Sequence, residues 1–178
     1  MKILEIRIKS LMITKMPKSG KTTTASKFPN SLLLAFEKGY NTLAGVMVQP
    51  VNNWSEFRSV LRELKKDEVK EKFSTIIVDT ADIAYEYATK YILANAGVDS
   101  ISDIPYGKGY GLVGQEFDEC LRGILQLNYG LVLISHSTDK VFKDQNGVEF
   151  NQIVPTLDKR ARLICERMCK QNIIYIAP

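Results

Sequence analysis

Residues 15–22 read Lys-Met-Pro-Lys-Ser-Gly-Lys-Thr and match the phosphate-binding pattern GxxxxGK[ST] at every fixed position except the first. In such a loop, backbone N–H groups converge on phosphate oxygens at the start of a helix, and the lysine reaches the β- and γ-phosphates. The threonine hydroxyl binds Mg²⁺. The sequence therefore predicts a nucleoside triphosphate site formed by Pro17, Lys18, Ser19, Gly20, Lys21, Thr22 and Thr23.

Lys15 stands where the pattern has its first glycine. A lysine costs little there if the backbone φ angle is negative, but on the order of 1 kcal/mol or more if φ is positive. The departure weakens the predicted site without abolishing it. Hydrolysis of the nucleotide and binding without hydrolysis both stay open, and the plain alternative is a lysine-rich turn before a helix.

A second feature, an acidic residue, supports the phosphate site independently of the loop. Residues 74–79 read Ser-Thr-Ile-Ile-Val-Asp, an apolar strand pattern that ends in a carboxylate. P-loop proteins hold Mg²⁺ through such an acid at the end of a neighbouring buried strand. We therefore predict that Asp79 and Thr22 hold the metal; the alternative is an ordinary helix N-cap by Asp79 or Thr80.

Short apolar runs alternate with segments of helical periodicity along the chain. The runs are typical of strands buried on both faces of a parallel sheet, and they cover 11–14, 31–36, 73–78, 131–134 and 173–176. Helical spacing predicts helices over 20–27, 54–64, 83–97, 113–125 and 157–168. This order predicts an α/β fold with a mostly parallel central sheet flanked by helices and joined by right-handed crossovers.

Three local features complete this prediction. Alternation over residues 4–8 predicts an edge strand, and Asn53 or Asn52 is the expected cap of the 54–64 helix. The glycine-rich residues 97–112 are expected to form a loop. Asn146-Gly147 predicts a type I′ turn in a β-hairpin inserted near 138–151.

The composition is that of an ordinary globular protein, with 45% hydrophobic and 25% charged residues in 178. This length suits one domain, residues 1–178. No apolar run is long enough to span a membrane, and three scattered cysteines fit a reducing cytoplasm. The formal net charge of +4 permits a polyanionic partner without requiring one.

Several segments together resemble the phage-encoded AAA/RecA-type nucleotide-binding proteins, a group that includes RecA-like single-strand annealing and recombination proteins of phages. The resemblance covers about residues 10–177 and is carried by 17–23, 27–34, 35–40, 76–80, 105–110 (Pro-Tyr-Gly-Lys-Gly-Tyr) and 131–136. It implies a RecA-like P-loop NTPase fold, ATP and Mg²⁺ as ligands, a homo-oligomeric ring or filament, single-stranded DNA as partner, and the host cytoplasm as location.

The resemblance also implies roles for two polar residues that follow predicted strands. Glu37 matches the glutamate that orients the attacking water in RecA-like ATPases, and a carboxylate beside the γ-phosphate suits that task. His136, after Ser135, matches the polar residue that reports the state of the γ-phosphate. The plain alternatives are a surface glutamate in a turn and a structural histidine.

Two segments are candidates for contact with single-stranded DNA. Residues 97–112 carry Tyr106, Lys108 and Tyr110, and residues 137–151 carry Lys140, Phe142 and Lys143. Aromatic rings among lysines suit base stacking with phosphate contact, although both segments also hold acids.

Lys159, Arg160 and Arg162 cluster at the start of the last predicted helix. In the ATPase class that the chain resembles, a basic residue of this kind completes the site of an adjacent subunit. The commoner fate of such a cluster is a solvated helix face, so both interpretations stay open.

The preferred function is a RecA-like ATPase in phage recombination or single-strand annealing. The alternatives are a nucleotide-dependent binding module that hydrolyses little, and a small nucleotide kinase, which ranks last because residues 137–151 contain no arginine for a lid. The chain stops just past a predicted strand, which leaves open a missing C-terminal segment.

Overall fold

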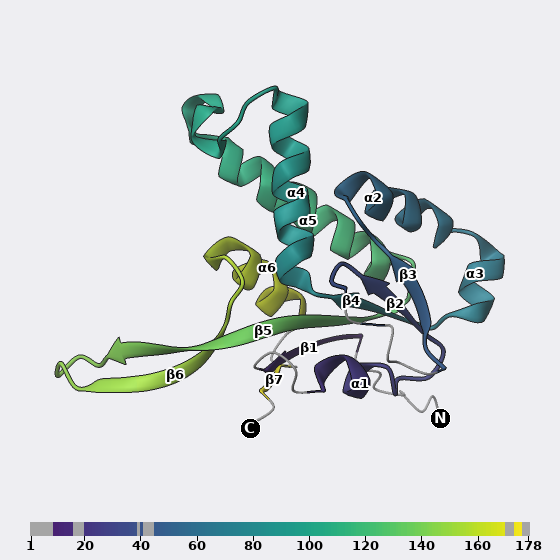
Figure 1. Ribbon diagram of the computed structural model, residues 1–178, viewed down its shortest axis with the longest axis horizontal. Coiled ribbons are helices and arrows are strands. Elements are labelled where there is room, and N and C mark those ends of the chain that lie inside the picture. The colour runs from purple at the N-terminus through teal and green to yellow at the C-terminus, as the bar shows by residue number, and fades with distance from the viewer. Residues whose placement is uncertain (1–8, 16–19, 39, 41–44, 170–172, 176–178) are drawn as a thin grey trace, which may run out of the picture.

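A parallel β-sheet forms the centre of the fold (Figure 1). The computed structural model describes residues 9–15, 20–38, 40, 45–169 and 173–175. In this part of the chain the strand order is β3-β2-β4-β5-β1-β7, and each neighbouring pair is parallel. Strand β6 pairs antiparallel with β5 and forms a hairpin that projects from the body. The expected α/β fold with a mostly parallel sheet and a β-hairpin is confirmed.

The strands are β1 (Ser10–Lys15), β2 (Ser31–Ala35), β3 (Met47–Pro50), β4 (Thr75–Asp79), β5 (Gly130–Lys143), β6 (Glu149–Pro155) and β7 (Ile173–Tyr175). The α-helices are α1 (Lys21–Ala25), α2 (Trp54–Glu63), α3 (Asp67–Lys72), α4 (Ala81–Ala96), α5 (Gly109–Gln126) and α6 (Lys159–Cys169). Two 3₁₀ turns, η2 (Ile101–Asp103) and η3 (Pro105–Gly107), join α4 to α5. No helix in the described ranges is long and apolar enough to cross a membrane.

The two faces of the sheet carry separate apolar clusters, because side chains alternate along each strand. Figure 1 shows α2, α4, α5 and α6 on one side and α1 on the other. The larger cluster packs under the four helices and includes Met12, Leu34 and Val78. The smaller cluster packs against α1 and consists of Leu11, Ile13, Ala25, Leu33, Ile77, Val132 and Ile134.

Aromatic rings fill the space between the larger helical layer and the sheet. Phe117 of α5 is fully buried. Its ring lies 5.2 Å from that of Tyr85 in an edge-to-face contact, and 6.2 Å from that of Trp54 in a stacked one. Trp54 Nε1 donates a hydrogen bond of 2.8 Å to Glu116 Oε1, which satisfies its buried polar atom.

Side-chain caps begin two helices of this layer, α2 and α4. Asn53 accepts from the backbone N–H of Glu56 and is the cap of α2, as expected. Thr80 accepts from the N–H of Ile83 at the start of α4. Helix α4 closes at Gly97, which has a φ of 64° and so adopts the left-handed conformation that glycine tolerates.

The prediction of a loop over 97–112 is wrong for its last residues, because α5 begins at Gly109. A Cβ at position 109 would lie 2.6 Å from the carbonyl oxygen of Ile101. The glycine therefore serves the close approach of η2 to the helix and does not indicate a flexible chain. Only the tertiary packing reveals this.

The prediction of a type I′ turn is also wrong. Such a turn needs positive φ at both central residues, yet only Gly147, with a φ of 81°, is left-handed there. The N–H of Gly147 bonds to the carbonyl of Asp144, and the Asp144 side chain accepts from the N–H groups of Asn146 and Val148. The Asp144 side chain thus favours a wider turn, which begins where β5 ends at Lys143.

Strand β3 and helix α3 were not predicted. Strand β3 is short, contains Gln49 and ends at Pro50, so it lacks an apolar run. It is an edge strand, paired only with β2 in the described sheet. The predicted strand over 4–8 lies outside the described residues. Helix α1 ends at Ala25 rather than near residue 27, and β5 is much longer than the predicted 131–134.

We predict that Phe117→Ala lowers the free energy of unfolding by about 3–5 kcal/mol, because the change leaves a cavity between the sheet and two helices. Urea unfolding followed by circular dichroism measures this. Phe28→Ala is the matched control, since Phe28 is 36% exposed; it should change stability by less than about 1 kcal/mol. Equal effects of the two substitutions would contradict this description of the core.

Candidate functional site

The register of the sheet brings polar side chains together at the carboxyl ends of the strands. Ala35, Asp79, Ile134 and Ile13 pair in one row across β2, β4, β5 and β1. Two residues beyond this row, on the same face by alternation, lie Glu37 after β2 and His136 on β5. We call Lys21, Thr22, Glu37, Asp79 and His136 the edge site.

The edge site lies on the face of the sheet that packs against α1. Asp79 follows Ile77, and His136 follows Ile134, each at the next position of the same face. Apolar side chains thus fill this face up to its edge, where polar ones replace them. Helix α1 begins directly at that edge and supplies the remaining two residues.

Gly20 sets the start of α1. It has φ 79° and ψ 19°, a left-handed conformation that strains any other L-residue. The helix then begins at Lys21, whose side chain is only 5% exposed. Thr23 is exposed on α1. Pro17, Lys18 and Ser19 lie outside the described residues.

Lys15 is the last residue of β1 and pairs with His136 in the parallel ladder. A residue in a strand has negative φ. The replacement of the first loop glycine by lysine therefore carries no conformational penalty at this position. The departure from the motif is compatible with the local backbone.

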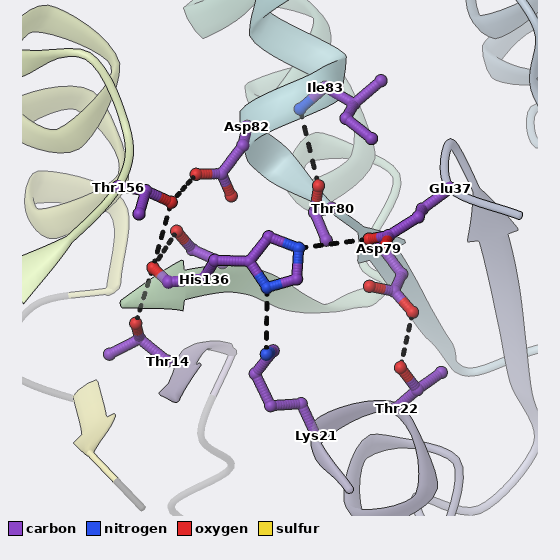
Figure 2. Close-up of polar contacts among 11 residues, drawn as sticks. Thr14, Lys21, Thr22, Glu37, Asp79, Thr80, Asp82, Ile83, His136 and Thr156 are labelled. Carbon is purple, nitrogen blue, oxygen red and sulfur yellow. Dashed lines mark hydrogen bonds and ion pairs between the residues drawn. The ribbon is translucent and has the colours of Figure 1, made fainter. Parts of the chain in front are cut away.

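Thr22 and Asp79 are in direct contact, as Figure 2 shows: Thr22 Oγ1 donates a hydrogen bond of 2.7 Å to Asp79 Oδ2. The expectation that Asp79 would end a strand next to β1 is wrong, because β5 lies between β1 and β4. Asp79 still reaches Thr22, because parallel strands end at a common edge of the sheet and α1 begins at that edge. The predicted pair is formed across an intervening strand.

Burial raises the pKa of the Asp79 carboxyl above its ordinary value, and the nearby carboxylate of Glu37 adds to this effect. The hydrogen bond from Thr22 and the charge of Lys21 act in the opposite direction but are outweighed. A poorly solvated carboxylate beside a hydroxyl oxygen is a suitable place for a hard divalent cation. The donor set therefore fits Mg²⁺.

Protein side chains supply only part of such a coordination shell. In the described ranges no three His, Cys, Asp or Glu side chains group closely enough to hold a metal ion. Mg²⁺ commonly takes one or two protein oxygens and completes its shell with phosphate and water. Thr22 and Asp79 match that pattern.

His136 joins Lys21 to Glu37 (Figure 2). Lys21 Nζ lies 3.2 Å from His136 Nδ1, and His136 Nε2 lies 3.2 Å from Glu37 Oε2. An ammonium group can only donate, so Nδ1 must accept and the ring proton must sit on Nε2. The neutral imidazole then donates to the Glu37 carboxylate, and the three side chains form one polar chain.

The backbone carbonyl of His136 is held separately from its ring. It accepts from Thr14 Oγ1 at 3.1 Å and from the Thr156 N–H at 2.9 Å. The Thr156 hydroxyl also donates to Asp82 Oδ1. These residues come from β1, the segment just after β6 and the start of α4, and they fix His136 in position.

Sequence reasoning missed Thr14, Asp82 and Thr156. Their partners lie far away along the chain, as with Thr14 and His136 at a separation of 122 residues. No local motif marks them. Only the pairing of the strands, and the position of the segment that follows the hairpin, could have identified them.

The remaining predicted residues are not brought into contact with the edge site. Lys140 and Lys143 lie on the hairpin, on opposite faces because three positions separate them. Lys143 forms an ion pair of 3.0 Å with Glu149 across the two strands. Tyr106, Lys108, Tyr110, Lys159 and Arg160 lie around α5 and α6.

Comparison with known proteins gives three findings. A family model described as an AAA domain matches residues 8–173. The SPbeta prophage-derived uncharacterized protein YorG of Bacillus subtilis (strain 168) is 33% identical over 146 residues, which cover 79% of this chain and 42% of that protein. The chain thus spans less than half the length of this curated relative.

Among solved structures, the pilus retraction motor PilT with bound ADP aligns with a TM-score of 0.27 and 13% identity, over 92% of this chain and 52% of that chain. A TM-score this low does not establish a common fold.

We predict that Gly20→Ala lowers the free energy of unfolding by about 1 kcal/mol, because alanine is strained at a φ of 79°. Gly123→Ala in α5 is the matched control, since a Cβ at either position meets nothing within 4 Å. The control should be neutral or stabilising by up to about 1 kcal/mol. Chemical denaturation measures both, and equal changes would contradict the role of the backbone angle.

The raised pKa of Asp79 makes a second prediction possible. The folded protein binds this proton more tightly than the unfolded chain, so stability is lost as pH rises from the ordinary aspartate value through the raised one. Asp79→Asn removes that loss. Without nucleotide or Mg²⁺, the variant should melt at a higher temperature than the parent at neutral pH.

The gain from Asp79→Asn should shrink towards zero as the pH falls to the ordinary pKa of an aspartate. Asp99→Asn is the control, because Asp99 is exposed and should melt like the parent throughout. Thermal melts over a pH series measure this. A gain that does not depend on pH would show that the buried charge of Asp79 is not its cause.

Proposed function

Since the chain belongs to the family of AAA domains, whose P-loops bind nucleotides, we propose that it is a Mg²⁺-dependent ATPase that acts in DNA recombination or single-strand annealing. The observation that carries the proposal is the convergence of Lys21, Thr22, Glu37, Asp79 and His136 at one edge of the sheet. These groups come from four separate segments of the chain. A structural role alone gives no reason for so many polar side chains at one place.

Nucleotide binding would use the start of α1. The N–H groups that follow Gly20 point out of the helix and attract phosphate oxygens. Lys21 would exchange its contact with His136 Nδ1 for the β- and γ-phosphates, since both are acceptors for its ammonium group. Thr22 and Asp79 would hold Mg²⁺, which neutralises charge on the phosphates.

Hydrolysis would depend on Glu37. Its carboxylate accepts a proton from a water molecule while the water oxygen forms a bond to the γ-phosphorus. The bond from that phosphorus to the bridging oxygen breaks at the same time, which yields ADP and inorganic phosphate. The Nε2 proton of His136 orients the Glu37 carboxylate, so His136 acts as a positioning residue.

The biological setting is part of the proposal. The prophage origin stated in the name of the relative supports a phage-encoded protein. Single-stranded DNA is the proposed partner, and a ring or filament of identical subunits the proposed assembly. The net charge of +4 is compatible with a polyanionic partner.

Two substitutions separate binding from hydrolysis. Lys21→Ala should abolish nucleotide binding measured by calorimetry and, with it, ATP turnover. Glu37→Gln should keep binding and lower turnover by about 10²- to 10⁴-fold, because the amide cannot accept the proton. Lys27→Ala, an exposed lysine just beyond α1, is the control and should match the parent.

Turnover is measured with and without single-stranded DNA. Equal rates in the parent, Lys21→Ala and Glu37→Gln would refute an ATPase at this site. Tight Mg²⁺-dependent ATP binding by a parent without turnover would instead identify a nucleotide-dependent binding module.

A further inference from the structure

The solvent-facing side of α6 is strongly basic. Lys159, Arg160, Leu163 and Arg167 are all exposed and lie on one side of the helix. The opposite side is buried against the core through Ala161, Ile164, Cys165 and Met168. Three of the four exposed positions therefore present cations to solvent.

This basic side faces the start of α5 across a groove. The groove has a volume of about 600 Å³ and is lined by Tyr110, Asp158, Lys159, Arg160, Leu163 and Arg167. A Cβ on Gly114 of α5 would lie 2.7 Å from Cδ of Arg160 on α6. Because glycine has no side chain, the aliphatic part of Arg160 has room to lie against α5. Tyr110 lies one helical turn before Gly114 on the same side of α5.

The cations of the α5–α6 groove are not neutralised within the described part of the chain. None of Lys159, Arg160 and Arg167 forms an ion pair with another described residue. The carboxylate of Asp158 accepts from the Arg160 N–H at 2.8 Å and thereby caps α6. The groove therefore keeps an excess of positive charge.

Exposed aromatic rings accompany this charge. The side chain of Tyr110 is 52% exposed, and Tyr106, just before α5, is 92% exposed. Lys108 Nζ lies 5.6 Å from the centre of the Tyr106 ring. Tyr106 also has a φ of 60°, an unfavourable value for a bulky residue, so neither burial nor backbone preference explains this tyrosine.

We propose that the α5–α6 groove binds single-stranded nucleic acid. Unpaired bases stack on Tyr110 and Tyr106, and backbone phosphates contact Lys159, Arg160 and Arg167. A duplex hides its base faces, so exposed rings among cations favour a single strand. The proposal rests on the proposed partner of the ATPase and assigns Lys159 and Arg160 to that partner rather than to the nucleotide site of an adjacent subunit.

Fluorescence anisotropy with a labelled oligothymidylate, in the absence of nucleotide, tests this. Tyr110→Ala should weaken binding between about fivefold and a hundredfold, whereas Tyr110→Phe should bind like the parent because stacking needs only the ring. Arg160→Ala should reduce the slope of log affinity against log salt by about 0.7, the effect of one lost phosphate contact on a single strand. The same oligothymidylate paired with its complementary strand should bind more weakly than the single strand.

Arg62→Ala is the matched control for charge, because Arg62 is an exposed arginine that lines another groove, between α2 and α5. It should keep the parental affinity and salt slope. Circular dichroism melts of every variant check that each one folds.

The outcomes separate this proposal from the ATPase proposal. If the parent binds the oligonucleotide and both Tyr110→Ala and Arg160→Ala bind it with the same affinity, the groove proposal is wrong and the ATPase proposal is unaffected. A parent that binds no oligonucleotide refutes both the groove and the proposed partner. If Arg160→Ala lowers ATP turnover without DNA and leaves oligonucleotide affinity unchanged, Arg160 serves an adjacent nucleotide site and the groove proposal is wrong.

Discussion

The parallel register of the sheet is the constraint on which the edge site depends. Four strands are aligned so that Ala35, Asp79, Ile134 and Ile13 share one row. Both faces of these strands are apolar up to that row, and polar side chains follow it on the face that packs against α1. A slip of one residue would move Asp79 and His136 to the face covered by α4 and α5. The energy that fixes the core therefore also fixes the chemistry at its edge.

Strand β5 connects the edge site to the most exposed part of the fold. Its first half is a buried core strand, its middle carries His136, and its last residues form one arm of the projecting hairpin. The carbonyl of His136 is held by Thr14 and by Thr156, which lies where the hairpin returns. Any shift of the His136 backbone must therefore be shared by both ends of the hairpin, because these hydrogen bonds join them.

Much of the fold was predictable because buried parallel strands produce continuous apolar runs. The runs at 31–36 and 73–78 correspond to β2 and β4, and Asn53 was recognisable as a helix cap. Errors occurred where local and tertiary signals differ. Gly109 suggests a loop but permits a close helix contact, and the Asp144 side chain produces a wider turn than Asn146-Gly147 predicts. Strand β3 carries no apolar run because it lies at an edge.

The sequence by itself determined Lys21, Thr22 and Asp79 of the edge site and the glycine that precedes them, Gly20, since these residues stand in recognisable local patterns. It also determined the faces of the strands, because alternation is a property of the chain. Only the tertiary structure decided that β5 separates β1 from β4, that His136 joins Lys21 to Glu37, and that α6 lies beside Tyr110. The physical reason is that these contacts link segments far apart in sequence, whose pairing is set by the packing of the whole sheet and its helices.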